Sequence, residues 1–183
     1  MSNKTTLCIL ILFQAFLSVG CGDKKIPNPD SKIEKNKREE EQKREQLKTQ
    51  IIQEKLILIK FYETTNGINW TDSNGWKVYN NVCDWYGIEC HIDGTVYKLN
   101  LPQNNLKGKI NPELGNLKNL GKLDLSENNL TGQIPKELGN FTKLYALLLF
   151  SNKLMGVVPS EVIALENNNT VLNFIGNQSL KRP

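Results

Sequence analysis

Short stretches in which apolar and polar residues alternate recur along the second half of the chain. Leu-x-Leu begins at Leu99, Leu123 and Leu147, an interval of 24 residues, and Leu172-x-Phe174 follows after 25. Alternation of this kind predicts a short β-strand that turns one face inward. Because one unit cannot bury its own inward leucines, the pattern predicts repeated units that stack on one another.

An asparagine and a glycine stand at fixed places in these units. Each asparagine follows a strand, and its amide can serve the backbone groups that a turn leaves unpaired. These asparagines are Asn104, Asn128, Asn152 and Asn177. Gly108, Gly132 and Gly156 follow the first three and allow backbone conformations that are closed to other residues. Segments 104–120 and 128–144 are identical at ten of seventeen positions, so the unit itself is what folds.

Apolar residues at intervals of three complete the first two units. This spacing suits a short 3₁₀ or helical turn on the side away from the strands. The residues are Leu114, Leu117 and Leu120, and then Leu138, Phe141 and Leu144.

Together these features resemble the leucine-rich repeat. Gly132-Gln133-Ile134-Pro135 fits the plant-type subclass fully, residues 156–159 fit it with a conservative change, and residues 108–111 lack the proline in register. The resemblance implies an α/β solenoid, a short curved leucine-rich repeat with parallel strands, preceded by a long N-terminal helix. It assigns residues 96–183 to about three full units and a partial capping unit.

Residues 51–95 resemble the N-terminal cap of plant-type repeats. Ile51, Leu58 and Tyr62 lie at near-helical spacing, which predicts an amphipathic helix. Three tryptophans then follow within sixteen positions and would cover the open end of the core with a large apolar area.

Cys83 and Cys90 lie within this cap region. They predict a disulfide if the chain is exported. A metal site is one alternative, for which only His91 is a nearby further ligand. Haem attachment is another, but the required Cys-x-x-Cys spacing is absent.

The first twenty residues predict a signal peptide, because an apolar stretch from Leu7 to Val19 follows Lys4. The sequence then reads Leu-Ser-Val-Gly-Cys, which resembles the lipobox of bacterial lipoproteins and implies cleavage before Cys21 and lipidation of Cys21. The stricter lipobox has leucine where Ser18 stands. The resemblance implies an exported lipoprotein with a palmitate-type anchor in the outer membrane or at the cell surface; ordinary secretion is the alternative.

Two polar segments connect the expected anchor to the cap. Residues 21–30 contain two prolines and no periodicity, which predicts a tether. Residues 31–50 are almost wholly charged and begin with a capping-box pattern at Ser31. We expect a solvated helical stalk there, and a disordered charged linker is the alternative.

Composition narrows the chemistry. The net charge is +4 and the chain has a single histidine, His91. Basic residues concentrate in the stalk among acids, so the sequence gives no case for nucleic-acid binding. No nucleophile motif or phosphate loop is present. We therefore expect a protein that is not an enzyme, with no catalytic residues, no metal and no cofactor.

The fold type implied by the resemblance places the strands on a concave face. Residues between the inward leucines would point to a partner. They are Tyr97, Lys98, Asn100, Lys122, Asp124, Tyr145, Leu148, Phe150, Asn173 and Ile175. We define Tyr145, Leu148, Phe150 and Ile175 as the apolar cluster and expect it to be the hot spot, because exposed apolar patches mark contact sites. Alternatively, the tail after Gly176 folds over it.

These expectations combine into one function. The sequence predicts a monomeric, membrane-anchored extracytoplasmic module that binds a protein ligand on its concave face, with host or cell-surface adhesion as its setting. A carbohydrate or cell-wall glycan binder is the alternative, suggested by the aromatic residues of the same face.

Overall fold

The computed structural model describes residues 29–182. The expected signal peptide, the lipidated Cys21 and residues 21–28 of the tether lie outside the described residues. The chain divides into two compact units, Met1–Glu41 and Gln42–Pro183. The repeats and their cap belong to the second unit.

A single helix, α2 (Pro29–Thr64), covers the expected stalk and the start of the cap. The helix begins earlier than expected, so Ser31 lies inside its first turn. Proline suits a first helical position, since its φ is preset and its missing N–H would have no partner there. Side chains 32–41 are all exposed, as expected of a solvated stalk. Within residues 29–182, no helix is long and apolar enough to cross a membrane.

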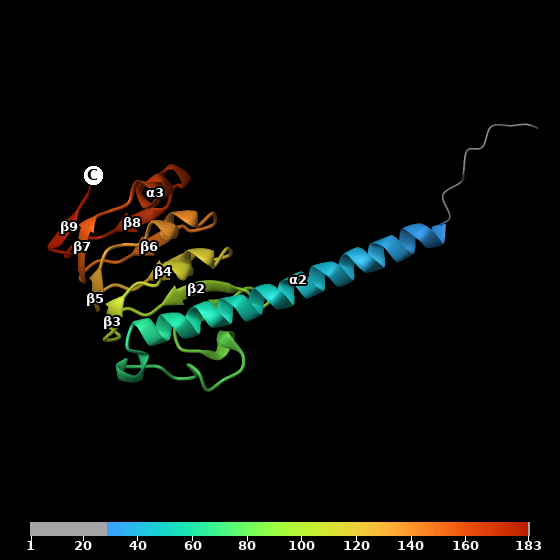
Figure 1. Ribbon diagram of the computed structural model, residues 1–183, viewed down its shortest axis with the longest axis horizontal. Coiled ribbons are helices and arrows are strands. Elements are labelled where there is room, and N and C mark those ends of the chain that lie inside the picture. Colours follow the sequence, from blue (N-terminus) through green and yellow to red (C-terminus); the bar gives the residue numbers. More distant parts are fainter. Residues whose placement is uncertain (1–28, 183) are drawn as a thin grey trace, which may run out of the picture. The chain divides into compact units, whose positions relative to one another are not determined.

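The alternating segments form one sheet, which we call the first sheet. Its strands are β1 (Ile88–Cys90), β2 (Val96–Asn100), β4 (Lys122–Asp124), β6 (Ala146–Leu148) and β8 (Val171–Asn173), in that spatial order (Figure 1). All neighbours are parallel except the pair β1 and β2, which is antiparallel. Leu99, Leu123, Leu147 and Leu172 align in one row, so the additional residue of the last interval leaves the register of this row intact.

The asparagine and glycine segments form another sheet, which we call the second sheet. It contains β3 (Lys107–Lys109), β5 (Asn129–Gly132), β7 (Lys153–Val157) and β9 (Ser179–Lys181), all parallel. No pattern of alternation in the sequence predicted this sheet. Gly108, Gly132 and Gly156 have φ values of 121°, 81° and 88°, which confirms their expected role.

Short helical segments close each unit on the other side. They are η3 (Pro112–Asn116), η4 (Lys136–Asn140), α3 (Ser160–Ile163) and η5 (Ala164–Asn168). The leucines predicted for the first two turns are buried, and so are the inward leucines of β2, β4 and β6. Each fully buried leucine contributes about 1.5–3 kcal/mol. The stacked core therefore holds the two sheets together.

The asparagine ladder connects the units. The side-chain carbonyl of Asn128 accepts from the backbone N–H groups of Asn104 and Leu106 at 3.0 and 2.9 Å, and its NH₂ donates to Leu101 and Ser126 carbonyls at 2.8 and 2.9 Å. Asn152 and Asn177 repeat this arrangement. Each amide thus satisfies backbone groups of two neighbouring units, as the sequence predicted.

The cap closes the first end of the core with aromatic rings. Trp70, Trp76 and Trp85 are all buried, with neighbouring ring centroids 4.8 Å apart. They pack beside η1 (Gly67–Asn69) and η2 (Val82–Asp84). Cys83 and Cys90 form a disulfide, with Cα atoms 5.6 Å apart. The disulfide prediction is confirmed, and the metal and haem alternatives are wrong because both thiols are consumed.

Candidate partner-binding face

Strand register arranges the outward residues of the first sheet into rows. One row contains Lys98, Lys122, Ala146 and Val171. The next contains Asn100, Asp124, Leu148 and Asn173. Because neighbouring strands lie about 4.8 Å apart, members of one row can touch the same ligand. The first row changes along the sheet from charged residues to apolar ones, whereas the second row has a single apolar residue, Leu148, between Asp124 and Asn173.

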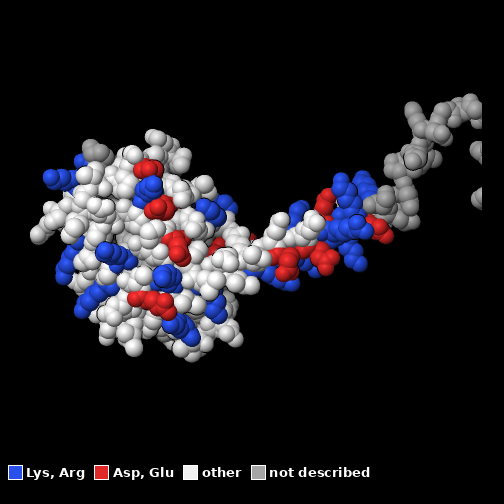
Figure 2. All heavy atoms as spheres, viewed as in Figure 1, with Lys and Arg blue, Asp and Glu red and all other residues white. Residues whose placement is uncertain are grey.

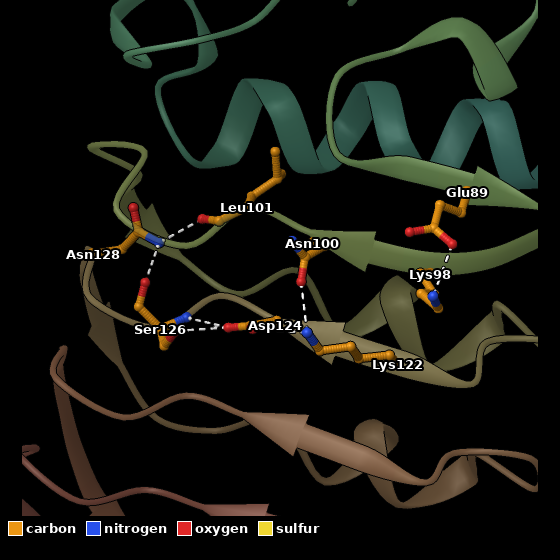
Figure 3. Close-up of polar contacts among 8 residues, drawn as sticks. All are labelled: Glu89, Lys98, Asn100, Leu101, Lys122, Asp124, Ser126 and Asn128. Carbon is orange, nitrogen blue, oxygen red and sulfur yellow. Dashed lines mark hydrogen bonds and ion pairs between the residues drawn. The ribbon is translucent and has the colours of Figure 1, made fainter.

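The charged half of this face is internally paired (Figure 3). Lys98 Nζ lies 2.8 Å from the Glu89 carboxylate, and Lys122 Nζ lies 3.1 Å from Asp124 and 2.7 Å from the Asn100 side-chain oxygen. The hydrogen bond to Glu89 raises the pKa of Lys98. Both lysines are therefore held in place before any partner arrives.

Asp124 is more buried than the sequence suggested. Only 7% of the residue is exposed, and its carboxylate accepts from the Ser126 backbone N–H and hydroxyl at 3.2 and 2.6 Å. Asn173 makes the corresponding bond to the Ile175 N–H at 3.1 Å. These two side chains shape the strand ends, and their contact with a partner stays a prediction.

The apolar half lies over β6 and β8. Tyr145 is 43% exposed and Ile175 is 79% exposed, whereas Leu148 and Phe150 are half-buried. The tail after Gly176 forms β9, which pairs with β7 in the second sheet. The tail is thus a strand of the other sheet, and two of the four cluster residues stay well exposed.

Two residues of this face were missed by sequence reasoning. Glu89 comes from β1, whose antiparallel pairing with β2 no repeat pattern announced. Val171, which is 60% exposed, joins the row of Lys98 only once Leu172 is aligned with Leu147. The position of Val171 on this face could have been predicted from the register of the inward leucines.

Aromatic rings gather at the start of the strands. The rings of Tyr97 and Tyr145 lie 6.3 Å apart, and His91 lies 4.7 Å from Tyr97. Gly121 stands between the tyrosines, where a Cβ atom would come within 2.5 Å of Tyr97. Partial burial and a hydrogen bond with Tyr97 raise the pKa of Tyr145. The arrangement offers aromatic surface and hydroxyl groups to a ligand.

The ionisable groups near this face are engaged by neighbours. The Asp93 carboxylate accepts from the Thr95 hydroxyl and N–H at 2.7 and 2.9 Å, and these bonds lower its pKa. Among residues 29–182, no group of three or more His, Cys, Asp or Glu could hold a metal ion.

Comparison with known families agrees with the stacked strands. A family model described as Leucine Rich Repeat matches residues 119–141, which include β4 and β5. The chain is a leucine-rich repeat protein. No curated protein matches it.

Solved structures with leucine-rich repeats share this architecture. One is the LRR ectodomain of the plant membrane receptor kinase GASSHO1/SCHENGEN3 from Arabidopsis thaliana, in complex with CASPARIAN STRIP INTEGRITY FACTOR 2. It is 33% identical, with a TM-score of 0.57, over 70% of this chain and 17% of that one. The PEPR1–AtPEP1 complex is 28% identical, with a TM-score of 0.57, over 70% of this chain and 18% of that one.

A third structure shares the fold alone. The Arabidopsis receptor kinase HAESA ectodomain, solved with an N-terminal extended IDA peptide hormone, is 22% identical, with a TM-score of 0.55, over 73% of this chain and 22% of that one. This leucine-rich repeat chain spans less than a quarter of the length of these receptor chains. Disulfides persist in oxidising compartments, so the Cys83–Cys90 bond and the likeness to ectodomains indicate an exported protein.

Proposed function

We propose that this protein is an extracytoplasmic module that binds a protein ligand on its first sheet and is held at a membrane by lipid on Cys21. The observation that carries the proposal is the exposure of Tyr145 and Ile175 at one end of a face on which Lys98 and Lys122 are paired with carboxylates. The peptide and protein ligands of the similar receptor ectodomains support the ligand class. The setting is the outer membrane or cell surface, with adhesion to a host or neighbouring cell, and the module acts as a monomer.

The two halves of the face would contribute differently to binding. Burying exposed apolar side chains contributes about 25 cal/mol per Å² removed from water. Ile175, Val171 and Tyr145 offer such area. The paired lysines, Lys98 and Lys122, would instead restrict which ligands fit, because a wrong charge opposite them is unfavourable. Affinity therefore depends chiefly on β6 and β8, and selectivity on β2 and β4.

Ile175 is the best position at which to test the proposed face. Phe150 is half-buried, so its replacement would alter packing as well as surface. Ile68 in η1 is a matched control, since it is 82% exposed and lies in the cap. A photo-reactive residue at position 175 or 68, in the full chain on intact cells, followed by mass spectrometry, would identify a partner captured only at position 175.

The captured partner then allows a quantitative test. Ile175→Ser is expected to weaken binding about tenfold, equivalent to about 1.4 kcal/mol, while Ile68→Ser binds as the wild type does. Melting curves of both variants should match the wild type. Equal capture at both positions, or wild-type affinity of Ile175→Ser, would show that the first sheet is not the binding face.

The lipid anchor has a separate test. Wild type and Cys21→Ala, both produced with the full N-terminal segment, are partitioned between detergent and aqueous phases. We expect the wild type in the detergent phase and the variant in the aqueous phase, because acyl chains provide the membrane affinity. If both proteins remain aqueous, the anchor proposal is wrong.

A cell-wall glycan is a second candidate ligand, favoured by the Tyr97–Tyr145 ring pair. Sugar rings pack on aromatic side chains, and the neighbouring Asn100 could donate hydrogen bonds. Retention on immobilised cell-wall polysaccharide that Tyr97→Ala abolishes and Ile175→Ser leaves intact would select this candidate. If the wild type is not retained on the polysaccharide, the glycan candidate is wrong.

A further inference from the structure

The second sheet carries lysines that have no acidic partner. Lys107 and Lys109 lie on β3 and Lys153 lies on β7, while Lys60 of α2 and Lys136 of η4 lie nearby. Among the described residues, none of these five lysines forms an ion pair. Figure 2 shows lysine and arginine residues along the margin of the molecule that corresponds to β3, β5, β7 and β9 in Figure 1.

A groove lies among these lysines. Its volume is about 980 Å³, and its lining crosses three units, from Ile110 through Thr131 to Met155. Lys60, Lys109 and Lys136 line it, and Glu137 is the single acidic residue of the lining. The groove therefore has an excess of positive charge.

The side chain of Lys109 lies across the groove. A Cβ atom on Gly132 would lie 3.2 Å from Cγ of Lys109 and 3.6 Å from its Cε, so the aliphatic stem of Lys109 runs over this glycine. The backbone of Lys109 pairs with Thr131, which pairs in turn with Lys153. Two strand spacings of about 4.8 Å separate Lys109 from Lys153, a span that three extended residues cover.

A buried donor adjoins the same groove. Asn111 lines it and is only 6% exposed, and its Nδ2 atom has no hydrogen-bond partner in the described part of the chain. Its Oδ1 atom is already used, since it accepts from the Glu113 N–H at 3.1 Å. A ligand rich in carbonyl and carboxylate oxygens would suit both this donor and the lysines.

The lining distinguishes among anionic ligands. It contains no aromatic ring on which a sugar could stack. It does contain Met155 and Pro135, which can contact aliphatic side chains. We propose that this groove docks an extended, acidic polypeptide segment. The site is separate from the first sheet and does not depend on the function proposed for it.

A labelled peptide tests the proposal directly. The probe is a fluorescein-labelled octapeptide of alternating Glu and Ala, and the comparison peptide has Gln in place of Glu. The triple variant Lys60→Gln, Lys109→Gln, Lys136→Gln removes the groove charges. The triple variant Lys32→Gln, Lys35→Gln, Lys37→Gln removes the same number of exposed charges from the N-terminal part of α2, outside the repeats, and serves as the matched control.

We expect the full-length protein to bind the Glu peptide at least tenfold more tightly than the Gln peptide in low salt. The groove variant should lose at least tenfold in affinity, and the control variant less than twofold. Unchanged circular dichroism melting confirms that the groove variant is folded. An equal loss in both triple variants would mean that net charge alone attracts the peptide and would overturn the proposal.

Two further arms separate the ligand classes. Vesicles containing anionic phospholipid and a sulfated polysaccharide are tested with the same proteins. If either binds through the groove lysines while the Glu peptide does not, the polypeptide assignment is wrong. Binding of the Ile175→Ser variant to the Glu peptide with wild-type affinity would show that the two sites are independent.

Discussion

The two sheets of the repeat unit hold their lysines in opposite settings. On the first sheet, Lys98 and Lys122 are each bound to a carboxylate and are largely shielded from solvent. On the second sheet, Lys107, Lys109 and Lys153 are exposed and have no ion pair. Paired charges contribute to the shape of a face, whereas unpaired charges are available to a partner. We therefore propose apolar recognition by the first sheet and electrostatic recognition by the second.

Asn128 bonds to the turns between the two sheets, so its loss should destabilise both sheets. Asn128→Ala is expected to lower the free energy of unfolding by about 3 kcal/mol or more, because buried backbone donors and acceptors of two units lose their partner. Urea denaturation measures this. Asn129→Ala is the matched control, since this neighbour is half-buried and its side chain makes no hydrogen bond among the described contacts; it should cost less than about 1 kcal/mol. Similar losses in both variants would contradict the ladder's role.

The same substitution on each sheet should have different effects on stability. Lys122→Met is expected to destabilise the fold by about 1 kcal/mol, since it leaves the buried Asp124 without its cation. Lys109→Met on the second sheet should change stability by less than about 0.5 kcal/mol, because its ammonium has no acidic partner to lose. Urea unfolding of the two variants side by side provides the measurement. A larger loss for Lys109→Met would reverse the assignment of the two faces.

The sequence predicted the first sheet because its signal is strong. Leucines at regular intervals specify both the strands and the stacking of the units. Cys83 and Cys90 left few alternatives to a disulfide. The second sheet gave no such signal. Lys107–Lys109 contains a central glycine and two lysines, a poor strand by composition, and it is extended only because stacking places β5 beside it.

The details of the candidate site could not be predicted from the sequence for a similar reason. Whether Phe150 is exposed depends on packing between units, and Glu89 meets Lys98 only because β1 pairs antiparallel with β2. Neither relation is local in sequence. The stalk helix was predictable, but its start at Pro29 depends on a proline that serves equally well in a tether.

The two sheets also differ in how one strand of each, β2 and β3, attaches to α2 and to Thr65 just beyond its end. The Val96 N–H of β2 donates to the buried carboxylate of Glu54 at 2.7 Å, whereas the Lys107 N–H of β3 donates to the backbone carbonyl of Thr65 at 3.0 Å. Burial raises the pKa of Glu54 above its ordinary value of 4.5, outweighing the hydrogen bonds from Val96 and Gln50. Only the first attachment should therefore respond to mild acid.

The direction in which stability changes with pH follows from proton binding by Glu54. Because the folded state holds the Glu54 proton more tightly than the unfolded state, stability falls as pH rises from 4.5 through the folded pKa, and the ionised carboxylate is unfavourable at pH 7. Glu54→Gln keeps an acceptor for Val96 but cannot ionise. It should be at least as stable as the wild type at pH 7, with the difference shrinking as pH approaches 4.5. Urea unfolding at several pH values measures it, and Glu41→Gln, at an exposed helix position, is the control.

Amide exchange locates the effect on one sheet. As pH falls from 7 toward 4.5, protection of the Val96 amide, corrected for intrinsic exchange, should increase relative to that of Lys107 in the wild type. The two amides should change together in Glu54→Gln, because neither then faces an ionisable acceptor. The prediction is wrong if Glu54→Gln is less stable than the wild type at pH 7 and its stability changes with pH as that of the wild type does. The charge of Glu54 would then be favourable in the folded protein, and the two attachments would not differ in the way proposed.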